Sequence, residues 1–385
     1  MIKENEYIIS VIPLAKIPLS REQFFYYSYN QKIPLGSLTK IPLGKRKLQG
    51  IVIACQKDFP RLGNIELKKI DAILEKSFLT ERQLTLARFI SDYYIAPLGI
   101  VLKSFVPQLT TPKQKKETSF KHHFLNQRNI LLTTEQKNAI HHIANENSDF
   151  LLFGDASSGK TQVYFEAIKK LTSTKNSQAL ILLPELTGIA QEIERYGREF
   201  GEKAIAVLHG KISKGQFYEN WKNIKSGKAK IIIGTRQAVF APFKNLKIII
   251  IDEEQDISHK QWDMTPRYDA RTVAKKLAEI FKAKIVLGSA TPRIETYYQA
   301  KQKRLEILKL PALQLANHKL QTVLVDLRRE HWKNWKKIKN ISPISEKLKV
   351  EIEYNLKYKR QIILFINRQG MSKFTICADC GEVLK

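Results

Sequence analysis

The chain has 385 residues, of which 43% are hydrophobic and 26% charged, and its formal net charge is +28. That length exceeds what one hydrophobic core usually organises, so we expect two or three domains of ordinary globular composition. The apolar runs are strand-length, which excludes a membrane-spanning helix, and three cysteines are too few for a disulfide framework. The N-terminus lacks a signal-peptide core, which favours a cytoplasmic location. The charge favours nucleic acid as a partner, because cationic side chains release condensed counterions; a lysine-rich solvated surface is the alternative.

The first hundred residues predict a small β-rich domain with a helix beside it. Four strand-like segments are separated by Gly and Pro turns, at 7–11, 24–29, 38–43 and 48–54. From Thr80 to Phe105 the apolar residues recur with a helical period. We therefore expect a first domain over residues 1–109. Residues 110–131 are polar and basic, which is typical of a linker.

Strand-like and helix-like patterns alternate between residues 132 and 310. Such alternation predicts an α/β domain, a parallel sheet with helices on both faces. The expected strands are 150–153, 179–183, 204–208, 230–233, 248–252 and 284–287. A second alternating unit is expected in 311–385. Its predicted elements are strands at 322–325 and 361–365 and a helix at 344–355.

The strongest motif joins the first of these strands to a helix. It reads G-x-x-x-x-G-K-T and lies between a buried strand and an amphipathic helix, which is the context of a phosphate-binding P-loop. Its glycines let backbone N–H groups point at phosphate oxygens, and the helix adds its positive end. Lys160 is expected on the β- and γ-phosphates and the Thr161 hydroxyl on Mg²⁺. The predicted nucleotide-binding loop comprises Gly154, Asp155, Ala156, Ser157, Ser158, Gly159, Lys160 and Thr161. A turn that contains Gly and Lys by chance is the alternative.

A second motif places carboxylates at the end of another strand. Four isoleucines, 248–251, precede Asp252-Glu253-Glu254-Gln255-Asp256, so the acidic residues are expected at the carboxyl edge of the sheet, where ligands bind. Asp252 is expected to hold Mg²⁺ and Glu253 to polarise the attacking water. With Lys160 they are the predicted catalytic residues. An acidic turn without chemistry is the alternative.

The loop after the acidic motif predicts contact with single-stranded nucleic acid. It contains Lys260, Trp262, Arg267 and Tyr268. Aromatic rings stack on bases and cationic groups meet phosphates, so these residues are predicted to bind DNA. A surface loop with one buried Trp is the alternative. After another strand, Thr235 and Arg236 suit contact with phosphates of a bound strand.

In this order the motifs resemble those of superfamily 2 helicases. The residues within them resemble those of the PriA (primosomal protein N′) family of replication-restart DNA helicases. The segments that carry the resemblance are 183–186, 208–210, 234–242, 252–256, 266–271 and 287–292, with 41–44, 92–94 and 97–99 before them and 365–370 and 377–381 after them. The resemblance therefore covers nearly the whole chain. Another superfamily 2 helicase or translocase is the first alternative, and a non-catalytic chain that binds DNA and ATP is the second.

The resemblance implies an ATP-dependent 3′–5′ DNA helicase that acts at stalled forks in replication restart and primosome assembly. It implies ATP and Mg²⁺ as cofactors and a monomer in the bacterial cytoplasm at the nucleoid. The implied partners are forked, single-stranded or 3′-ended DNA, restart proteins and single-strand binding protein. Residues 1–109 would bind a DNA 3′ end, 132–310 would be a RecA-like ATP-binding lobe, and 311–385 would begin a second such lobe and a zinc module. Gln136 would read adenine, and Ser289 and Thr291 would couple nucleotide state to DNA.

Three features depart from the family's pattern. Residues 110–131 are too short for its winged-helix domain, and Gln255 replaces its usual His. The arginine-bearing motif of the second lobe is not in the sequence, so we expect a truncated product that binds ATP and turns it over slowly. Cys377 and Cys380 supply two of the four ligands that Zn²⁺ needs, half a site by resemblance, although their spacing alone also fits a redox pair or chance. Cys55 is expected in the core.

Overall fold

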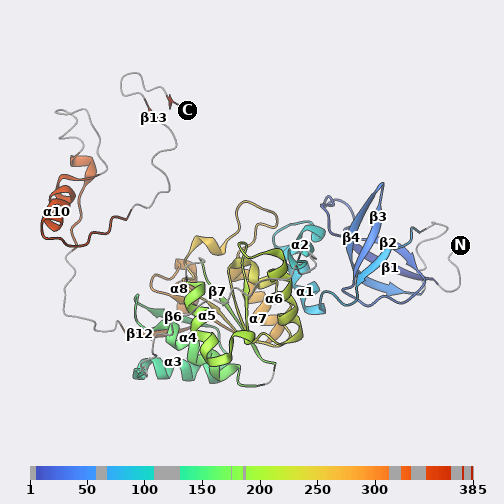
Figure 1. Cartoon of the computed structure of the whole chain (residues 1–385), viewed down its shortest axis with the longest axis horizontal. Helices are drawn as coiled ribbons and strands as arrows, with labels where there is room; N and C mark the ends of the chain where they lie inside the picture. The colour runs from blue at the N-terminus through green and yellow to red at the C-terminus, as the bar shows by residue number, and fades with distance from the viewer. Residues whose placement is uncertain are drawn as a thin grey trace. The chain divides into compact units, whose positions relative to one another are not determined.

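The computed structural model describes residues 6–57, 67–107, 131–174, 176–184, 188–311, 322–330 and 344–365, and the backbone of 375–376 and 383–384. The chain divides into two units, Met1–Leu313 and Gln314–Lys385 (Figure 1). The basic segment 110–130, predicted as a linker, lies outside the described residues, and so do Cys377 and Cys380. No helix of the described ranges is long and apolar enough to cross a membrane.

The N-terminal part is a five-stranded antiparallel sheet. Its order is β2-β1-β4-β3-β5, and the strands are β1 (Tyr7–Pro13), β2 (Phe25–Tyr29), β3 (Leu38–Leu43), β4 (Arg46–Gln56) and β5 (Ala72–Glu75). A two-residue turn joins β3 to β4, and Gly44 in it has φ +60°, a value that glycine adopts without strain. The four predicted strands are confirmed, whereas β5 was not predicted. Cys55 in β4 is partly buried and packs against the hydrophobic cluster of the sheet that includes Ile9 and Val52.

Two helices follow the sheet where a single helical stretch was predicted. They are α1 (Glu81–Tyr93), which starts with a capping box between Thr80 and Gln83, and α2 (Leu98–Phe105). Between them Ile95 has φ +50°, and Pro97 precedes α2. A proline in a helix interior removes a hydrogen bond and disfavours helical backbone in the residue before it, which is why one continuous helix over 80–105 is wrong.

Residues 132–310, called the motor part below, contain a seven-stranded parallel sheet of order β12-β6-β11-β10-β7-β9-β8 (Figure 1). The strands are β6 (Phe150–Gly154), β7 (Gln178–Leu182), β8 (Ile205–Leu208), β9 (Ile231–Gly234), β10 (Leu246–Ile251), β11 (Lys284–Ser289) and β12 (Glu306–Leu310). The six predicted strands are confirmed. The seventh, β12, pairs with β6 at the edge of the sheet and was not predicted.

Helices cover both faces of this sheet. They are α3 (Thr134–Asn145), α4 (Lys160–Leu171), α5 (Ile189–Phe200), α6 (Lys214–Ser226), α7 (Ala270–Phe281) and α8 (Ile294–Lys301), with short 3₁₀ turns η1 (Glu202–Ala204), η2 (Arg236–Phe240) and η3 (Ile257–His259). Ile248 and Ile250 of β10 pack with α3, α4 and α5, whereas Ile249 and Ile251 pack with α6 and α7. Strands with two buried faces read as continuous apolar runs, so the predicted α/β class is confirmed.

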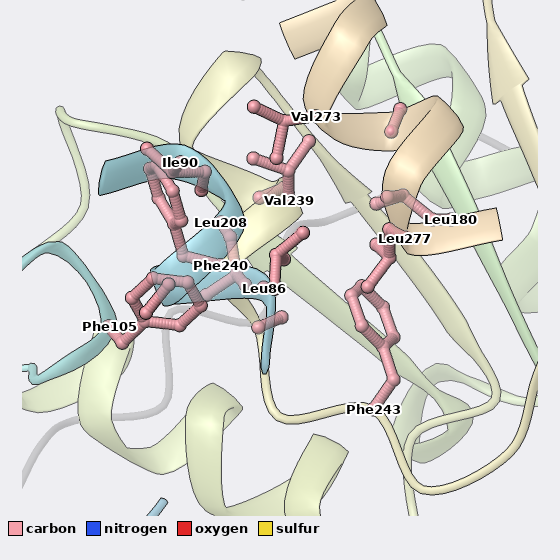
Figure 2. Close-up of a cluster of buried hydrophobic side chains, with 14 of the residues drawn as sticks. Leu86, Ile90, Phe105, Leu180, Leu208, Val239, Phe240, Phe243, Val273 and Leu277 are labelled. Atoms are coloured by element: carbon pink, nitrogen blue, oxygen red, sulfur yellow. The ribbon is translucent and has the colours of Figure 1, made fainter. Parts of the chain in front are cut away.

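The two N-terminal helices share one hydrophobic core with the motor. Figure 2 shows Leu86 and Ile90 of α1 and Phe105 of α2 packed around Val239 and Phe240 of η2. The rings of Phe105 and Phe240 meet edge to face with centroids 4.9 Å apart. The Gln83 side chain also donates to the Phe240 carbonyl at 3.1 Å. This core holds α1 and α2 against η2, which begins at the predicted DNA contact Arg236 and follows the predicted contact Thr235.

In the unit 314–385 the described elements are α10 (Glu346–Lys357) and the strand pair β13 (Thr375–Ile376) and β14 (Val383–Leu384). The predicted helix over 344–355 is confirmed with a shift of two residues. The strands predicted at 322–325 and 361–365 are wrong, since neither segment forms a strand in the structure. A strand forms only when a neighbour satisfies its backbone N–H and C=O groups. The second RecA-like lobe stays a prediction.

Candidate nucleotide site

The P-loop and the acidic motif lie at the same edge of the motor sheet. Strands β6, β11 and β10 are neighbours, and their carboxyl ends continue into the P-loop, Ser289 and Asp252. Because all strands are parallel, these three segments meet at one edge, which is where open α/β sheets bind ligands. The structure thus brings together the predicted nucleotide-binding and catalytic residues.

The P-loop backbone is shaped for an anion. Gly159 has φ +84° directly before α4, and a Cβ on it would lie 2.3 Å from Nε2 of Gln136. A Cβ on Gly154 would lie 2.5 Å from Oγ of Ser158. Only glycine fits at both positions, and the loop delivers its N–H groups to the N-terminus of α4.

The side chains of the loop also fit a phosphate. Lys160 is 8% exposed, and its ammonium donates to the carbonyls of Gly154 at 2.8 Å and Asp155 at 3.1 Å, so it lies folded over the loop. The Ser158 hydroxyl is buried without a hydrogen-bond partner among the described residues. A buried unpaired hydroxyl costs free energy unless a ligand or water meets it. An orphaned donor, a cation and a helix N-terminus together suit a nucleotide phosphate.

Gln136 contacts the P-loop from α3. Its Oε1 accepts from the Thr133 N–H at 3.0 Å in a capping box, and its Nε2 donates to the Ser158 carbonyl at 3.1 Å. The helix start and the loop are therefore tied together by one amide. The adenine-reading role that the family resemblance implies for Gln136 stays a prediction.

The acidic motif begins with a partly buried carboxylate and a strained residue. Burial raises the pKa of Asp252, and its Oδ1 accepts a 2.9 Å hydrogen bond from the Tyr164 hydroxyl. Glu253 has φ +46°, a left-handed conformation that costs free energy for a non-glycine residue. Its Oε2 accepts from Nε2 of Gln255 at 2.6 Å. A strained conformation of this kind persists where surrounding contacts hold the backbone in place, and such residues are common at functional sites.

Gln255 links the predicted catalytic carboxylate to β11. While its Nε2 donates to Glu253, its Oε1 accepts from the Ser289 hydroxyl, and Ser289 Oγ in turn accepts from the Thr291 N–H at 2.9 Å. An amide carries a donor and an acceptor that do not depend on protonation. The residue that departs from the family's usual His therefore completes a chain from Glu253 to Thr291.

Other polar contacts at this edge were not predicted. Glu254 is fully buried, and its carboxylate accepts from the Arg293 N–H and the Thr296 hydroxyl at the start of α8, which identifies it as a structural residue. Arg271 pairs with Asp269 and donates to the backbone carbonyl of Glu254 at 2.6 Å. The contacts of Glu254 with Arg293, Thr296 and Arg271 have no local sequence signal, because these partners lie at least seventeen residues away along the chain.

The predicted DNA-binding residues divide into exposed and buried ones. Trp262 is 54% exposed, and the Lys260 ammonium lies 3.9 Å from its ring centroid. Arg267 is also exposed. Tyr268 is only 1% exposed and packs edge to face on Phe240, so the prediction that it stacks on bases is wrong. Burial of its large apolar ring in the core stabilises the fold.

Two further predicted residues follow β9. Thr235 precedes η2, and the Arg236 guanidinium donates to the Ser258 carbonyl at 3.3 Å. This bond joins the start of η2 to η3, which follows the acidic motif. A role of Thr235 and Arg236 in DNA contact stays a prediction.

A separate polar cluster lies at the opposite edge of the sheet. His142 Nδ1 is 2.7 Å from Glu146 and 3.0 Å from Glu306, the first residue of β12. Nearby, an open pocket of about 810 Å³ is lined by residues that include Lys284 and Glu306. Neither these three side chains nor the pocket adjoins the P-loop, so they do not belong to the nucleotide site.

A parallel sheet with a P-loop and an acidic strand end at one edge defines a P-loop motor domain. Residues 133–300 match the family model of the DEAD/DEAH box helicases, and residues 14–107 match that of the PriA 3′DNA-binding domain. Among solved structures, the chain is similar to a DEAD box protein from Methanococcus jannaschii, with 18% identity and a TM-score of 0.36 over 58% of this chain and 63% of that one. It is also similar to RecG bound to a three-way DNA junction, with 21% identity and a TM-score of 0.39 over 72% and 37%.

Curated relatives agree with both family models. The replication restart protein PriA of Bacillus subtilis (strain 168) is 39% identical over 259 residues, which are 66% of this chain and 31% of that protein. The PriA of Rickettsia prowazekii (strain Madrid E) is 34% identical over 380 residues, 96% of this chain and 56% of that protein. Over nearly its whole length the chain is therefore similar to the PriA replication restart proteins. The chain spans about half the length of the Rickettsia prowazekii protein.

Proposed function

We propose that this chain is the ATP- and DNA-binding part of an ATP-dependent 3′–5′ DNA helicase that restarts replication at stalled forks. The observation that carries the proposal is the meeting of the P-loop and the acidic motif at one sheet edge, beside an N-terminal domain that matches the PriA 3′DNA-binding model. The second match favours a PriA-type helicase over other superfamily 2 motors, because its family model describes a PriA domain.

In this proposal each residue at the sheet edge has one task. Lys160 leaves its two loop carbonyls to bind the β- and γ-phosphates, and the N–H groups that follow Gly159 bind the remaining oxygens. Thr161 and Asp252 would hold Mg²⁺, which when bound neutralises charge on the phosphates. Glu253 orients the attacking water and accepts its proton. Gln255 holds Glu253 in place and reports its position to Ser289 and Thr291.

The DNA-binding proposal rests on charge and on exposed aromatic surface. The net charge is +28, and the exposed Trp262 ring pairs with the half-buried Lys260 in the loop between β10 and α7. Residues 1–109 would hold a DNA 3′ end, and η2, which packs against α1 and α2, would carry Thr235 and Arg236 to the DNA backbone. Because η2 and the loop both adjoin the acidic motif, DNA contact there can reach the ATP site.

The similarity to PriA proteins extends the proposal to partners and location. We infer a monomer that works with restart proteins and single-strand binding protein in the cytoplasm, on the nucleoid. Cys377 and Cys380 would supply two ligands of a zinc site. Metal analysis of the purified chain tests the last point. Bound zinc that is lost in Cys377→Ser would support the assignment, and zinc content unaffected by that change would contradict it.

Nucleotide titration tests the ATP site. A fluorescent ATP analogue should bind the wild-type chain in the presence of Mg²⁺, and Lys160→Ala should weaken that binding at least about tenfold, because it removes a charge-assisted contact to the phosphates. Lys170→Ala is the matched control, since Lys170 is an exposed lysine on the same helix. Equal affinity of wild type and Lys160→Ala would refute the assignment of the loop.

A further inference from the structure

Tyr164 belongs to none of the motifs, yet its hydroxyl lies in the nucleotide site. The side chain is 2% exposed on α4, and its hydroxyl donates to Asp252 Oδ1 at 2.9 Å. We propose that Tyr164 is a positioning residue that holds Asp252 by one carboxylate oxygen and so presents the other to Mg²⁺. The inference rests on the proposed function and deepens its account of the metal site.

The helix geometry couples this bond to the P-loop. Tyr164 follows Lys160 by four residues and Thr161 by three, so the three side chains lie on one face within about one helical turn. The ammonium that meets phosphate, the hydroxyl predicted on Mg²⁺ and the hydroxyl on Asp252 therefore move as one rigid unit. A single hydrogen bond sets the acidic strand end in register with the loop across two neighbouring strands.

The neighbouring strand is built to admit this ring. A Cβ on Gly288 of β11 would lie 1.5 Å from the Tyr164 hydroxyl oxygen and 2.7 Å from its ring carbon Cζ. Any side chain at position 288 would expel the phenol from its place. Glycine inside a strand weakens the strand and often marks the close approach of another group. Here the group that approaches is the phenol that reaches Asp252.

A phenol suits the task better than a charged donor. A partly buried carboxylate needs hydrogen bonds to offset its lost hydration. A tyrosine hydroxyl, with an ordinary pKa near 10, donates one such bond at neutral pH without adding positive charge. A lysine or arginine here would pair with Asp252 and compete with Mg²⁺. Partners that orient a metal ligand in this way typically contribute about 10- to 100-fold to metal affinity.

The test separates metal binding from nucleotide binding in the whole 385-residue chain. A fluorescent ATP analogue is titrated in EDTA and then at graded MgCl₂, and the Mg²⁺ concentration that gives half of the tightening is measured. We expect Tyr164→Phe to bind the analogue in EDTA within about twofold of wild type and to need about tenfold more Mg²⁺. Tyr27→Phe is the control, because it removes a buried phenol from the N-terminal sheet.

Gly288→Ala is the second variant, since its methyl group displaces the phenol without altering Tyr164 itself. It too should raise the Mg²⁺ midpoint, and melting curves of both variants report whether they fold. A wild-type Mg²⁺ midpoint in both folded variants would overturn the inference and leave the proposed function standing. A wild-type chain that fails to bind the analogue, or binds it equally with and without Mg²⁺, would overturn both.

Discussion

Glu192 offers a sharp test of the electrostatics around the nucleotide site. It lies on α5 and is 8% exposed. Burial raises the pKa of its carboxyl from 4.5 to about 7, although the Arg195 guanidinium, 3.3 Å away, acts in the opposite direction. Asp252 adds a like charge that raises the pKa further. Glu192→Gln replaces the carboxyl by a neutral group of the same shape.

The sign of the effect follows from proton linkage. Between pH 4.5 and 7 the folded protein keeps the Glu192 proton and the unfolded chain does not, so this stabilisation is complete below about pH 4.5 and is lost as pH rises through 7. The pKa difference, from 4.5 to about 7, corresponds to about 3.5 kcal/mol at about 1.4 kcal/mol per unit of pKa, of which roughly 3 kcal/mol is lost between pH 5 and 8.5. Glutamine mimics the protonated form at every pH, so the variant lacks this loss.

Thermal melting at pH 5 and pH 8.5 in EDTA measures the effect. The melting temperature of Glu192→Gln relative to wild type should rise by roughly 6–12 °C between the two pH values, taking about 2–4 °C per kcal/mol for a unit of this size. Glu219→Gln changes an exposed glutamate and should show no such rise. If wild type and Glu192→Gln lose stability in parallel between pH 5 and 8.5, the buried carboxyl is not neutral in the folded protein and the reasoning fails.

Two further predictions concern the core between α1 and the motor and the exposed aromatic loop. Leu86→Ala should lower the free energy of unfolding by about 2–5 kcal/mol in denaturant titrations, because Leu86 is buried between α1 and η2; Leu19→Ala, at an exposed leucine, should change little. Trp262→Ala should weaken binding of a single-stranded oligonucleotide by about 1–3 kcal/mol if its ring stacks on a base, while the slope of log affinity against log salt stays that of wild type. Unchanged single-strand affinity would exclude Trp262 from the DNA interface.

Where side-chain patterns are local, the sequence predicted the structure. Ile248–Ile251 is apolar at every position because both faces of its strand are covered, and the acidic residues that follow had to lie at the strand end. The glycines and Lys160 of the P-loop needed only the strand before and the helix after them to be recognised. The parallel sheet followed from the alternation of such segments. These features depend on neighbours within about ten residues.

The failures came where a distant segment decides the outcome. Residues 322–325 and 361–365 have apolar residues typical of strands, but pairing requires a neighbour that periodicity does not reveal. β12 is short, with alternating exposure, and it is a strand because β6 offers an edge to pair with. The break before α2 is different, since Pro97 stood in the sequence and its effect on the preceding residues was open to prediction.

At the candidate site the same distinction separates motifs from contacts. The sequence determined that the chain has a P-loop, an acidic strand end and an aromatic loop, because each is a short contiguous pattern with its own chemistry. Only the tertiary structure decided that Tyr268 is buried on Phe240 while Trp262 is exposed, although both are aromatic residues of one loop. It also decided that Tyr164, one apolar-face residue among several, meets Asp252, which lies 88 residues later in the chain, because β10 lies beside α4 and Gly288 leaves room for the ring.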